Sequence, residues 1–294
     1  MTAPPIVITG CPRSGTKMMG RVIGNLIQEL CLVTEHDSVI GGIPEDQSQV
    51  FDHELWWEAF DYPARDSQTG VPLIESPLAS DEAIESLRER YLEIARGRQL
   101  VIKNPSHVLY PSLVRQIFPD AQFLYCLRDP WPTIHSMTKA GRESFLLRSH
   151  RVVTQGQSLV HKAAMGWSDA VASLAEHRDD SWCVIRYEEM TRTPVEAITQ
   201  ICEQIRIDGE PNVESAVRIP RPESGGDFYR LKQQLRACGH VEAVLAEVEA
   251  GSRQHNYDTD PFALPGGWFD HMSGRIKKRL GYSALTKFPA AKSA

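Results

Sequence analysis

The sequence Ile6-Val-Ile-Thr-Gly-Cys-Pro-Arg-Ser-Gly-Thr-Lys-Met-Met19 joins a short apolar run, a glycine-bearing turn and the start of an amphipathic segment. The apolar run predicts a buried strand, and the apolar spacing after the turn predicts a helix. A strand, turn and helix in this order direct backbone N–H groups and the positive end of the helix dipole at one point. The segment therefore predicts a binding site for an anion such as a phosphate or sulfate.

The glycine spacing of this loop is close to that of the P-loop of ATPases. Gly10 and Gly15 match the G-x-x-x-x-G frame, but Thr16 and Lys17 follow where that motif has Lys and then Ser or Thr. The residue after Lys17, where the magnesium-binding hydroxyl should follow the lysine, is Met18. A P-loop kinase or NTPase is therefore one alternative, and a tight turn without a ligand is another.

Apolar runs and helical patterns alternate along the rest of the chain. We expect buried strands at Ile6–Thr9, Leu100–Lys103, Gln122–Leu127 and Trp182–Tyr187, and helices at Met18–Leu30, Asp81–Arg96, Leu159–His177 and Val195–Ile205. Uninterrupted apolar strands that alternate with helices are typical of βαβ units. The expected fold class is α/β, a three-layer P-loop-like fold with a central, mostly parallel sheet and helices on both faces.

The length of 294 residues suits one large α/β domain, and we expect residues 1–294 to form a single domain. Two stretches interrupt the alternation, at about 36–77 and 207–227, and both are rich in turn-forming residues. Connections this long are typical of loops that cover a site. We interpret them as insertions that form loops or lids.

Composition limits the partners and the compartment. With 32 basic and 38 acidic residues the net charge is −6, which argues against a nucleic-acid partner. No apolar run approaches the length of a transmembrane segment, and no signal peptide is evident. The six cysteines show neither close pairing nor metal-ligand spacing, so we expect a reduced, cytoplasmic protein without a metal site.

A second motif, Arg128-Asp-Pro-Trp-Pro-Thr-Ile-His-Ser136, follows the predicted strand Gln122–Leu127. Its prolines start a helix whose early turns bring Ser136 back beside Arg128. An arginine guanidinium can donate two parallel hydrogen bonds to a phosphate, and the serine hydroxyl can donate another. Taken together, Pro12-Arg-Ser-Gly-Thr16 and the Arg128/Ser136 pair resemble the 5′-phosphosulfate loop and the 3′-phosphate motif of the sulfotransferases that use 3′-phosphoadenosine-5′-phosphosulfate (PAPS).

The resemblance runs from residue 6 to about 205 and implies transfer of a sulfuryl group from PAPS to a hydroxyl, with 3′,5′-ADP (PAP) as product. It is nearer to the bacterial, tyrosyl-protein and carbohydrate types than to the cytosolic small-molecule branch. It assigns the 5′-phosphosulfate to Arg13, Ser14, Gly15, Thr16, Lys17 and Met18, the 3′-phosphate to Arg128 and Ser136, and the adenine to Tyr187. Tyr187 could instead pack in the core, and Lys17 stands where relatives have Thr or Ser. The family's transfer requires no metal.

Sulfuryl transfer needs positive charge on the transferring oxygens and a base for the acceptor hydroxyl. Arg13 and, by resemblance, Lys103 would supply the charge. Glu35 is the preferred base, because sulfotransferases that use a glutamate have it in this region. His107 is the alternative base, although it follows Lys103 by four residues where the cytosolic branch has its histidine two residues after the lysine.

The expected acceptor is a carbohydrate, small molecule or lipid. Trp56, Trp57, Phe60 and Tyr62 in the first insertion would form either a stacking wall for the acceptor or a small core of their own. A group of basic residues lies near the C-terminus and comprises Arg275, Lys277, Lys278, Arg279 and Lys287. We interpret it as a solvent-exposed helix face, with a surface that contacts the nucleotide or anionic lipid as the alternative. A non-catalytic nucleotide-binding relative is a further alternative.

Overall fold

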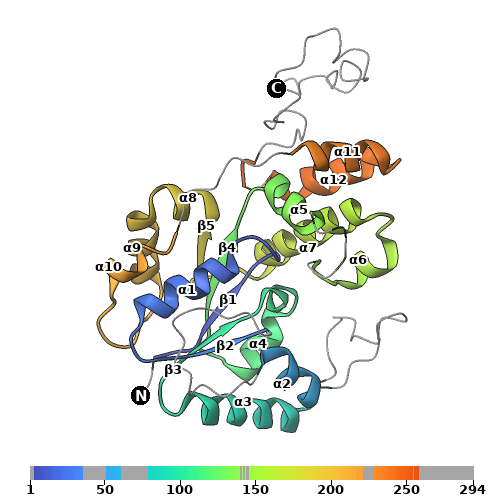
Figure 1. Cartoon of the computed structure of the whole chain (residues 1–294). Helices are drawn as coiled ribbons and strands as arrows, with labels where there is room; N and C mark the ends of the chain where they lie inside the picture. The colour runs from blue at the N-terminus through green and yellow to red at the C-terminus, as the bar shows by residue number, and fades with distance from the viewer. Residues whose placement is uncertain are drawn as a thin grey trace.

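The computed structural model of the chain describes residues 3–35, 51–60, 79–139, 141, 143, 146–220, 228–253 and 255–257. Its centre is a five-stranded sheet in the order β2-β3-β1-β4-β5, and every neighbouring pair of strands is parallel (Figure 1). The strands are β1 (Ile6–Thr9), β2 (Leu30–Thr34), β3 (Gln99–Lys103), β4 (Gln122–Leu127) and β5 (Trp182–Arg186). Parallel strands need crossover connections, which helices provide here.

Helices cover both faces of this sheet (Figure 1). On one face lie α1 (Thr16–Leu26), α8 (Tyr187–Arg192), α9 (Pro194–Gln204) and α10 (Val213–Ala216). The other face carries α2 (Asp52–Ala59), α3 (Asp81–Ala95), the 3₁₀ helix η1 (Pro105–Leu109), α4 (Pro111–Ile117), α5 (Pro130–Thr138), α7 (Leu159–His177), α11 (Tyr229–Ala237) and α12 (Val241–Ser252), and α6 (His150–Gln155) packs on α7. The expected three-layer α/β fold is confirmed.

The central strand shows how the sequence builds these layers. Ile6 and Ile8 of β1 point into the core shared with α1 and α9, whereas Val7 points into the core shared with α3 and α7. All three side chains are fully buried. Successive strand residues face opposite sides of a sheet, so an uninterrupted apolar strand requires cover on both sides.

The predicted elements lie within two residues of the observed boundaries, except at the end of the first helix. Ser80 caps the N-terminus of α3 by accepting a hydrogen bond from the Ala83 N–H (3.2 Å). The predicted helix Met18–Leu30 was wrong at its end, because α1 stops at Leu26 and Leu30 begins β2, a strand that was not predicted. The predicted strand at 182–187 ends one residue early, since its last residue begins α8.

The two predicted insertions are described in part. The first contains α2 and the second contains α10, so neither is a simple loop over its described part. Residues 36–50, 61–77 and 221–227 of these stretches lie outside the described residues, as do the basic residues near the C-terminus. That residues 1–294 form a single domain stays a prediction.

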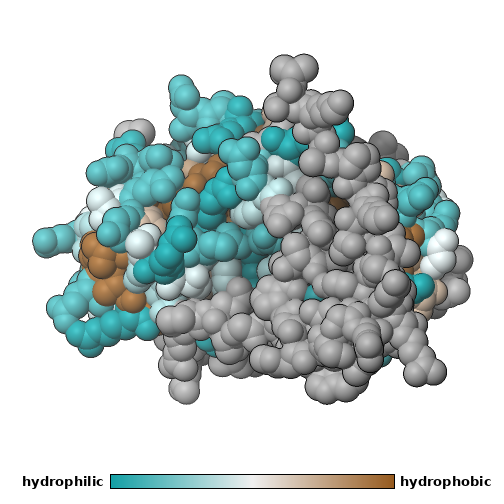
Figure 2. Space-filling view, turned by 90° about the horizontal axis from the view of Figure 1, so that it is seen from above, coloured by the Kyte–Doolittle hydropathy of each residue, from teal (hydrophilic) through white to brown (hydrophobic). Residues whose placement is uncertain are grey.

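The described surface is predominantly hydrophilic on the face seen in Figure 2, with apolar side chains in small separate groups. Among the described residues, the large apolar side chains that are exposed are Trp57, Leu92 and Val195, on α2, α3 and α9. Isolated apolar residues of this kind are ordinary on a protein surface. Within the described part of the chain, no helix combines the length and apolar character needed to cross a membrane.

Candidate active site

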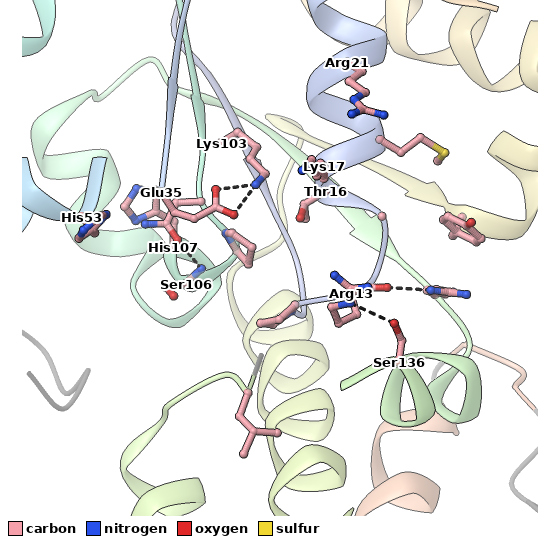
Figure 3. Close-up of a pocket in the computed structure, with 18 of the residues that line it drawn as sticks. Arg13, Thr16, Lys17, Arg21, Glu35, His53, Lys103, Ser106, His107 and Ser136 are labelled. Atoms are coloured by element: carbon pink, nitrogen blue, oxygen red, sulfur yellow. Dashed lines mark hydrogen bonds and ion pairs between the residues drawn. The ribbon is translucent and has the colours of Figure 1, made fainter. Parts of the chain in front are cut away.

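The predicted site residues meet at one edge of the sheet, because parallel strands all end on the same side (Figure 3). A cavity of about 770 Å³ opens there. Of the predicted residues, those that line it are Arg13, Gly15, Thr16, Lys17, Met18, Glu35, Lys103, His107, Arg128, Ser136 and Tyr187. Ser14 is a buried residue of the loop, and its hydroxyl has no hydrogen-bond partner among the described residues.

The loop between β1 and α1 is tight and depends on glycine. Gly15 has φ +107°, a conformation that side chains with a Cβ rarely adopt, and a Cβ there would lie 2.7 Å from Cδ2 of Tyr187. The Ser14 N–H donates to the Cys11 carbonyl oxygen (3.0 Å), which closes the turn. The helix that follows has no acidic residue in its first turn, so its dipole stays uncompensated there.

The loop is joined directly to the second motif. Nε of Arg13 donates to Oγ of Ser136 (3.0 Å), and Nη1 of Arg128 donates to the Arg13 carbonyl oxygen (2.9 Å). Burial and, second, the charge of Arg128 hold the pKa of Arg13 below its usual value. Two neighbouring guanidinium groups repel each other, so an anion between them would stabilise the arrangement.

Both the side chain and the backbone of Arg128 contact buried or half-buried aromatic residues. Its guanidinium carbon lies 4.2 Å from the centroid of the Tyr187 ring, and its carbonyl oxygen accepts a hydrogen bond from Nε1 of the buried Trp167 (3.1 Å). Asp129 caps α5 by accepting from the Trp131 N–H (2.9 Å). Tyr187 is half-buried and lines the cavity, so its ring is not part of the core.

Glu35 and Lys103 form a shielded ion pair on the other side of the loop (Figure 3). Nζ of Lys103 lies 2.5 Å from Oε2 of Glu35, and the Lys103 residue is 1% exposed. Their residues are adjacent because β2 pairs with β3, with Thr34 beside Lys103. Burial lowers the pKa of Lys103 below its ordinary value; the carboxylate of Glu35 opposes this shift, and the charge of Lys17 adds to it.

His107 lies in a second polar group, whose central carboxylate sequence reasoning missed. Oδ2 of Asp52, in α2, lies 3.0 Å from Nε2 of His107 and accepts from Nδ2 of Asn104 (2.6 Å), while the Tyr91 hydroxyl donates to Oδ1. Burial opposes ionisation of Asp52, but the charge and hydrogen bond of His107 and the hydrogen bonds of Tyr91 and Asn104 hold its pKa below the ordinary value. Nothing local in the sequence marks Asp52, because Tyr91 and Asn104 follow it by 39 and 52 residues.

The aromatic residues in and directly after α2 were expected to form either a stacking wall or a small core, and they do some of each. Trp56 and Phe60 are buried in the core, whereas Trp57 is 42% exposed. Both tryptophans line the cavity, and the Trp56 ring lies 4.5 Å from that of His107 and 5.5 Å from that of Tyr110. Trp56 therefore belongs to both wall and core; Tyr62 lies outside the described residues.

The described ranges contain no cluster of three or more His, Cys, Asp or Glu side chains arranged to hold a metal ion. All six cysteines are unpaired thiols, and burial raises the pKa values of Cys11 and Cys126. The ionisable side chains that line the cavity are Arg13, Arg21 and Arg128, Lys17 and Lys103, Glu35, Tyr110 and Tyr187, and the two histidines His53 and His107.

A parallel α/β sheet with a glycine loop between its central strand and the following helix defines a protein with a P-loop-like fold. The sequence matches the model of the sulfotransferase family over residues 4–211, which is well over half of the chain. The chain belongs to the sulfotransferase family, and sulfuryl transfer is the activity of that family.

Solved structures of sulfotransferases align with the chain at low sequence identity. The sulfotransferase domain of the olefin synthase of Synechococcus PCC 7002 aligns with a TM-score of 0.52 and 15% identity, covering 87% of this chain and 96% of that one. The sulfotransferase domain from the curacin biosynthetic pathway gives 0.48 and 15%, covering 90% and 100% of the two chains. A mouse sulfotransferase crystallised with PAP gives 0.40 and 15%, covering 96% and 82%. None of the curated proteins matches the chain.

Proposed function

We propose that the protein is a PAPS-dependent sulfotransferase of the EC 2.8.2 class. The observation that carries the proposal is the link from Arg13 to Ser136 and from Arg128 back to the Arg13 carbonyl, which joins two anion-binding motifs into one site. A donor with a 5′-phosphosulfate and a 3′-phosphate needs two such motifs side by side. Family membership does not favour the kinase alternative.

The loop would hold the 5′-phosphosulfate. Its donors are the first-turn N–H groups of α1, the Thr16 hydroxyl and the Arg13 guanidinium, and the buried Ser14 hydroxyl has no hydrogen-bond partner among the described residues. Lys17 is a cation on the cavity wall and adds charge there. The residues of the second motif would bind the 3′-phosphate, and the Tyr187 ring would contact the adenine.

In the transfer step the acceptor oxygen attacks the sulfur in line, and the bond from sulfur to the bridging phosphate oxygen breaks. The acceptor proton passes to Glu35, and PAP leaves with the bonding electrons. Before transfer Glu35 neutralises Lys103; protonation of Glu35 ends this pairing. The full charge of Lys103 then becomes available to the leaving oxygen at the moment when negative charge develops there.

The acceptor would approach past α2 and η1, whose aromatic residues line that part of the cavity. A carbohydrate, small molecule or lipid with a flat face fits this wall. No metal is required, since cationic side chains supply the positive charge that Mg²⁺ supplies in kinases. The free thiols fit a reducing compartment such as the cytoplasm, and the net charge of −6 fits the absence of a nucleic-acid partner.

The donor assignment is tested by thermal unfolding with PAP, 5′-AMP and Mg-ATP in parallel. A ligand at 100 times its Kd stabilises the folded state by about 2.7 kcal/mol, which is several degrees for a chain of this size. We expect PAP to raise Tm well above the value with 5′-AMP. A shift with Mg-ATP alone would favour a kinase, and no shift with any nucleotide would overturn the donor assignment.

The base is tested with the matched variants Glu35→Gln and His107→Gln. We expect Glu35→Gln to lower kcat by at least about 100-fold while PAP affinity stays near that of the wild type. His107→Gln should retain turnover of a simple monohydroxy acceptor. The reverse pattern, with turnover lost only in His107→Gln, would move the base to His107.

A further inference from the structure

A carboxylate behind the cavity joins the ends of two neighbouring strands. Oε1 of Glu188, in the first turn of α8, accepts a hydrogen bond from the backbone N–H of Asp129 (2.9 Å), and Oε2 accepts one from the Tyr257 hydroxyl (3.3 Å). Neither Glu188 nor Tyr257 is among the described residues that line the cavity. Any effect of Glu188 on a ligand must therefore pass through the residues that do line it.

The pairing of β4 with β5 ends just before the nucleotide site. Its last pair joins Leu127 to Arg186, and each of these residues directly precedes one assigned to the nucleotide. Beyond this pair the two segments are linked by the stacked guanidinium and tyrosine ring and by the hydrogen bond from Asp129 to Glu188. The carboxylate thus extends into the site the connection that the sheet provides up to its edge.

Both polar groups of the peptide between Arg128 and Asp129 have partners. Its carbonyl oxygen accepts a hydrogen bond from Nε1 of the buried Trp167 (3.1 Å), and its N–H donates to Glu188 (2.9 Å). A peptide unit is planar, so hydrogen bonds on both sides of it fix the orientation of the plane. Because the Arg128 side chain leaves the chain directly beside this plane, the two hydrogen bonds also limit the direction in which its guanidinium points.

Tyr257 contacts both partners of that peptide. Its ring lies edge-on to the Trp167 ring, with 6.5 Å between the centroids, and its hydroxyl donates to Glu188. Burial and, second, the charge of Glu188 raise the pKa of Tyr257 above its ordinary value, so the hydroxyl keeps the proton that it donates. Arg186 fixes this segment, with its guanidinium carbon 4.8 Å from the Tyr257 centroid and its Nη2 donating to the His255 carbonyl oxygen (2.6 Å).

We propose that Glu188, oriented by Tyr257, is a positioning residue that directs the Arg128 guanidinium at the 3′-phosphate of the donor nucleotide. This inference rests on the proposed function, which assigns the 3′-phosphate to Arg128. The segment after α12 thereby sets how well the site distinguishes PAP from 5′-AMP, although Tyr257 is not among the described residues of the cavity wall.

The charge of Glu188 separates this role from a simple electrostatic effect. A carboxylate close to Arg128 repels a phosphate bound there, so removal of the charge alone should tighten PAP binding. Removal of a hydrogen bond should weaken PAP binding, because the peptide and the guanidinium lose their fixed orientation. The sign of the change in affinity therefore shows which effect dominates.

The first test measures the Kd values of PAP and 5′-AMP by isothermal titration for wild type, Glu188→Gln and Glu189→Gln. A glutamine offers one acceptor oxygen where the carboxylate offers two, so one of the two hydrogen bonds is lost. We expect the Kd for 5′-AMP divided by the Kd for PAP to fall about three- to tenfold in Glu188→Gln. Glu189→Gln is the matched control, because Glu189 lies in the same turn of α8 but pairs with Arg186 (4.0 Å), and its ratio should stay close to that of the wild type.

Three results would contradict the inference. A tighter PAP complex in Glu188→Gln would mean that the carboxylate acts only through its charge. An equal loss of affinity for both nucleotides, or a lower Tm with an unchanged ratio, would mean that Glu188 only stabilises the fold. PAP that fails to bind the wild type would instead overturn the proposed donor, and this inference with it.

The second test uses Tyr257→Phe, which keeps the ring and removes the hydroxyl that donates to Glu188. We expect the same ratio to fall in this variant, and the double variant with Glu188→Gln to lose no more than Glu188→Gln alone. Because Tyr257→Phe leaves the carboxylate in place, it also tests the inference if Glu188→Gln does not fold. An unchanged ratio in Tyr257→Phe, or additive losses in the double variant, would refute the role given to Tyr257.

Discussion

Replacement of Arg128 by lysine keeps a positive charge at the end of β4 but removes the planar guanidinium, which can donate two hydrogen bonds to one phosphate. The arginine donates to the Arg13 carbonyl over 2.9 Å and stacks on Tyr187 at 4.2 Å. A lysine ammonium cannot do both from this position. The variant thus loses a hydrogen bond of about 1 kcal/mol and a stacked cation–ring contact of about 1–2 kcal/mol.

Two effects of different kind follow from the Arg128→Lys change. The free energy of unfolding should fall by about 2–3 kcal/mol, which corresponds to roughly 4–12 °C in Tm for a chain of this size. The affinity for PAP should fall by about 10- to 100-fold, because a two-pronged contact to the 3′-phosphate is lost. The affinity for 5′-AMP, which has no 3′-phosphate, should change much less.

Isothermal titration of both nucleotides into wild type and variant measures the difference directly. The quantity of interest is the Kd for 5′-AMP divided by the Kd for PAP, which we expect to fall at least tenfold in Arg128→Lys. Arg115→Lys is the control, since Arg115 pairs with Asp179 and does not line the cavity. An equal loss of affinity for both nucleotides would refute the reasoning, because Arg128 would then stabilise the loop without binding the 3′-phosphate.

Three further outcomes are expected. Gly15→Ala should lower Tm and weaken PAP binding, since φ is +107° and the new Cβ would lie 2.7 Å from the Tyr187 ring. Gly97→Ala is the control in thermal unfolding, because Gly97 also has a positive φ but has open space for a Cβ, so its effect on Tm reports backbone strain alone. In urea titrations, the difference in free energy of unfolding between wild type and Asp52→Asn should shrink as pH falls below about 4. The pKa of Asp52 in the folded protein lies below its ordinary value, so the carboxylate stabilises the fold at pH values above that ordinary value. This stabilisation is lost as the carboxylate becomes protonated in the folded protein. Trp57→Ala should raise KM for the acceptor severalfold in steady-state kinetics and leave the Kd for PAP unchanged, because Trp57 lines the cavity from α2, where the acceptor is proposed to approach.

The residues assigned to the donor could be placed together from the sequence because each of the two motifs is contiguous. The loop from Gly10 to Lys17 joins one strand to the next helix, and Arg128 and Ser136 share one strand end and the helix after it. Local rules for turns and helix starts are sufficient for such segments. Their mutual contact needed only that β1 and β4 be neighbours.

The other half depends on contacts between distant residues. The Glu35–Lys103 pair spans 68 positions and exists because β2 lies beside β3, yet β2 was not predicted. Its first residue, Leu30, continues the helical spacing of α1, so periodicity alone favoured a longer helix there. Asp52 was missed for the same reason, because its burial follows from tertiary neighbours and not from its own segment.

The strand order places the two groups of site residues on opposite sides of β1. The middle strand is β1. On one side of it, Arg128 directly follows β4 and Tyr187 directly follows β5. On the other side, Lys103 ends β3 and Glu35 directly follows β2. On the proposed function, substitutions in α2 and η1 should change the choice of acceptor and leave the affinity for the nucleotide unchanged. The scaffold is in this sense modular, and directed evolution of acceptor choice should concentrate its mutations on α2 and η1.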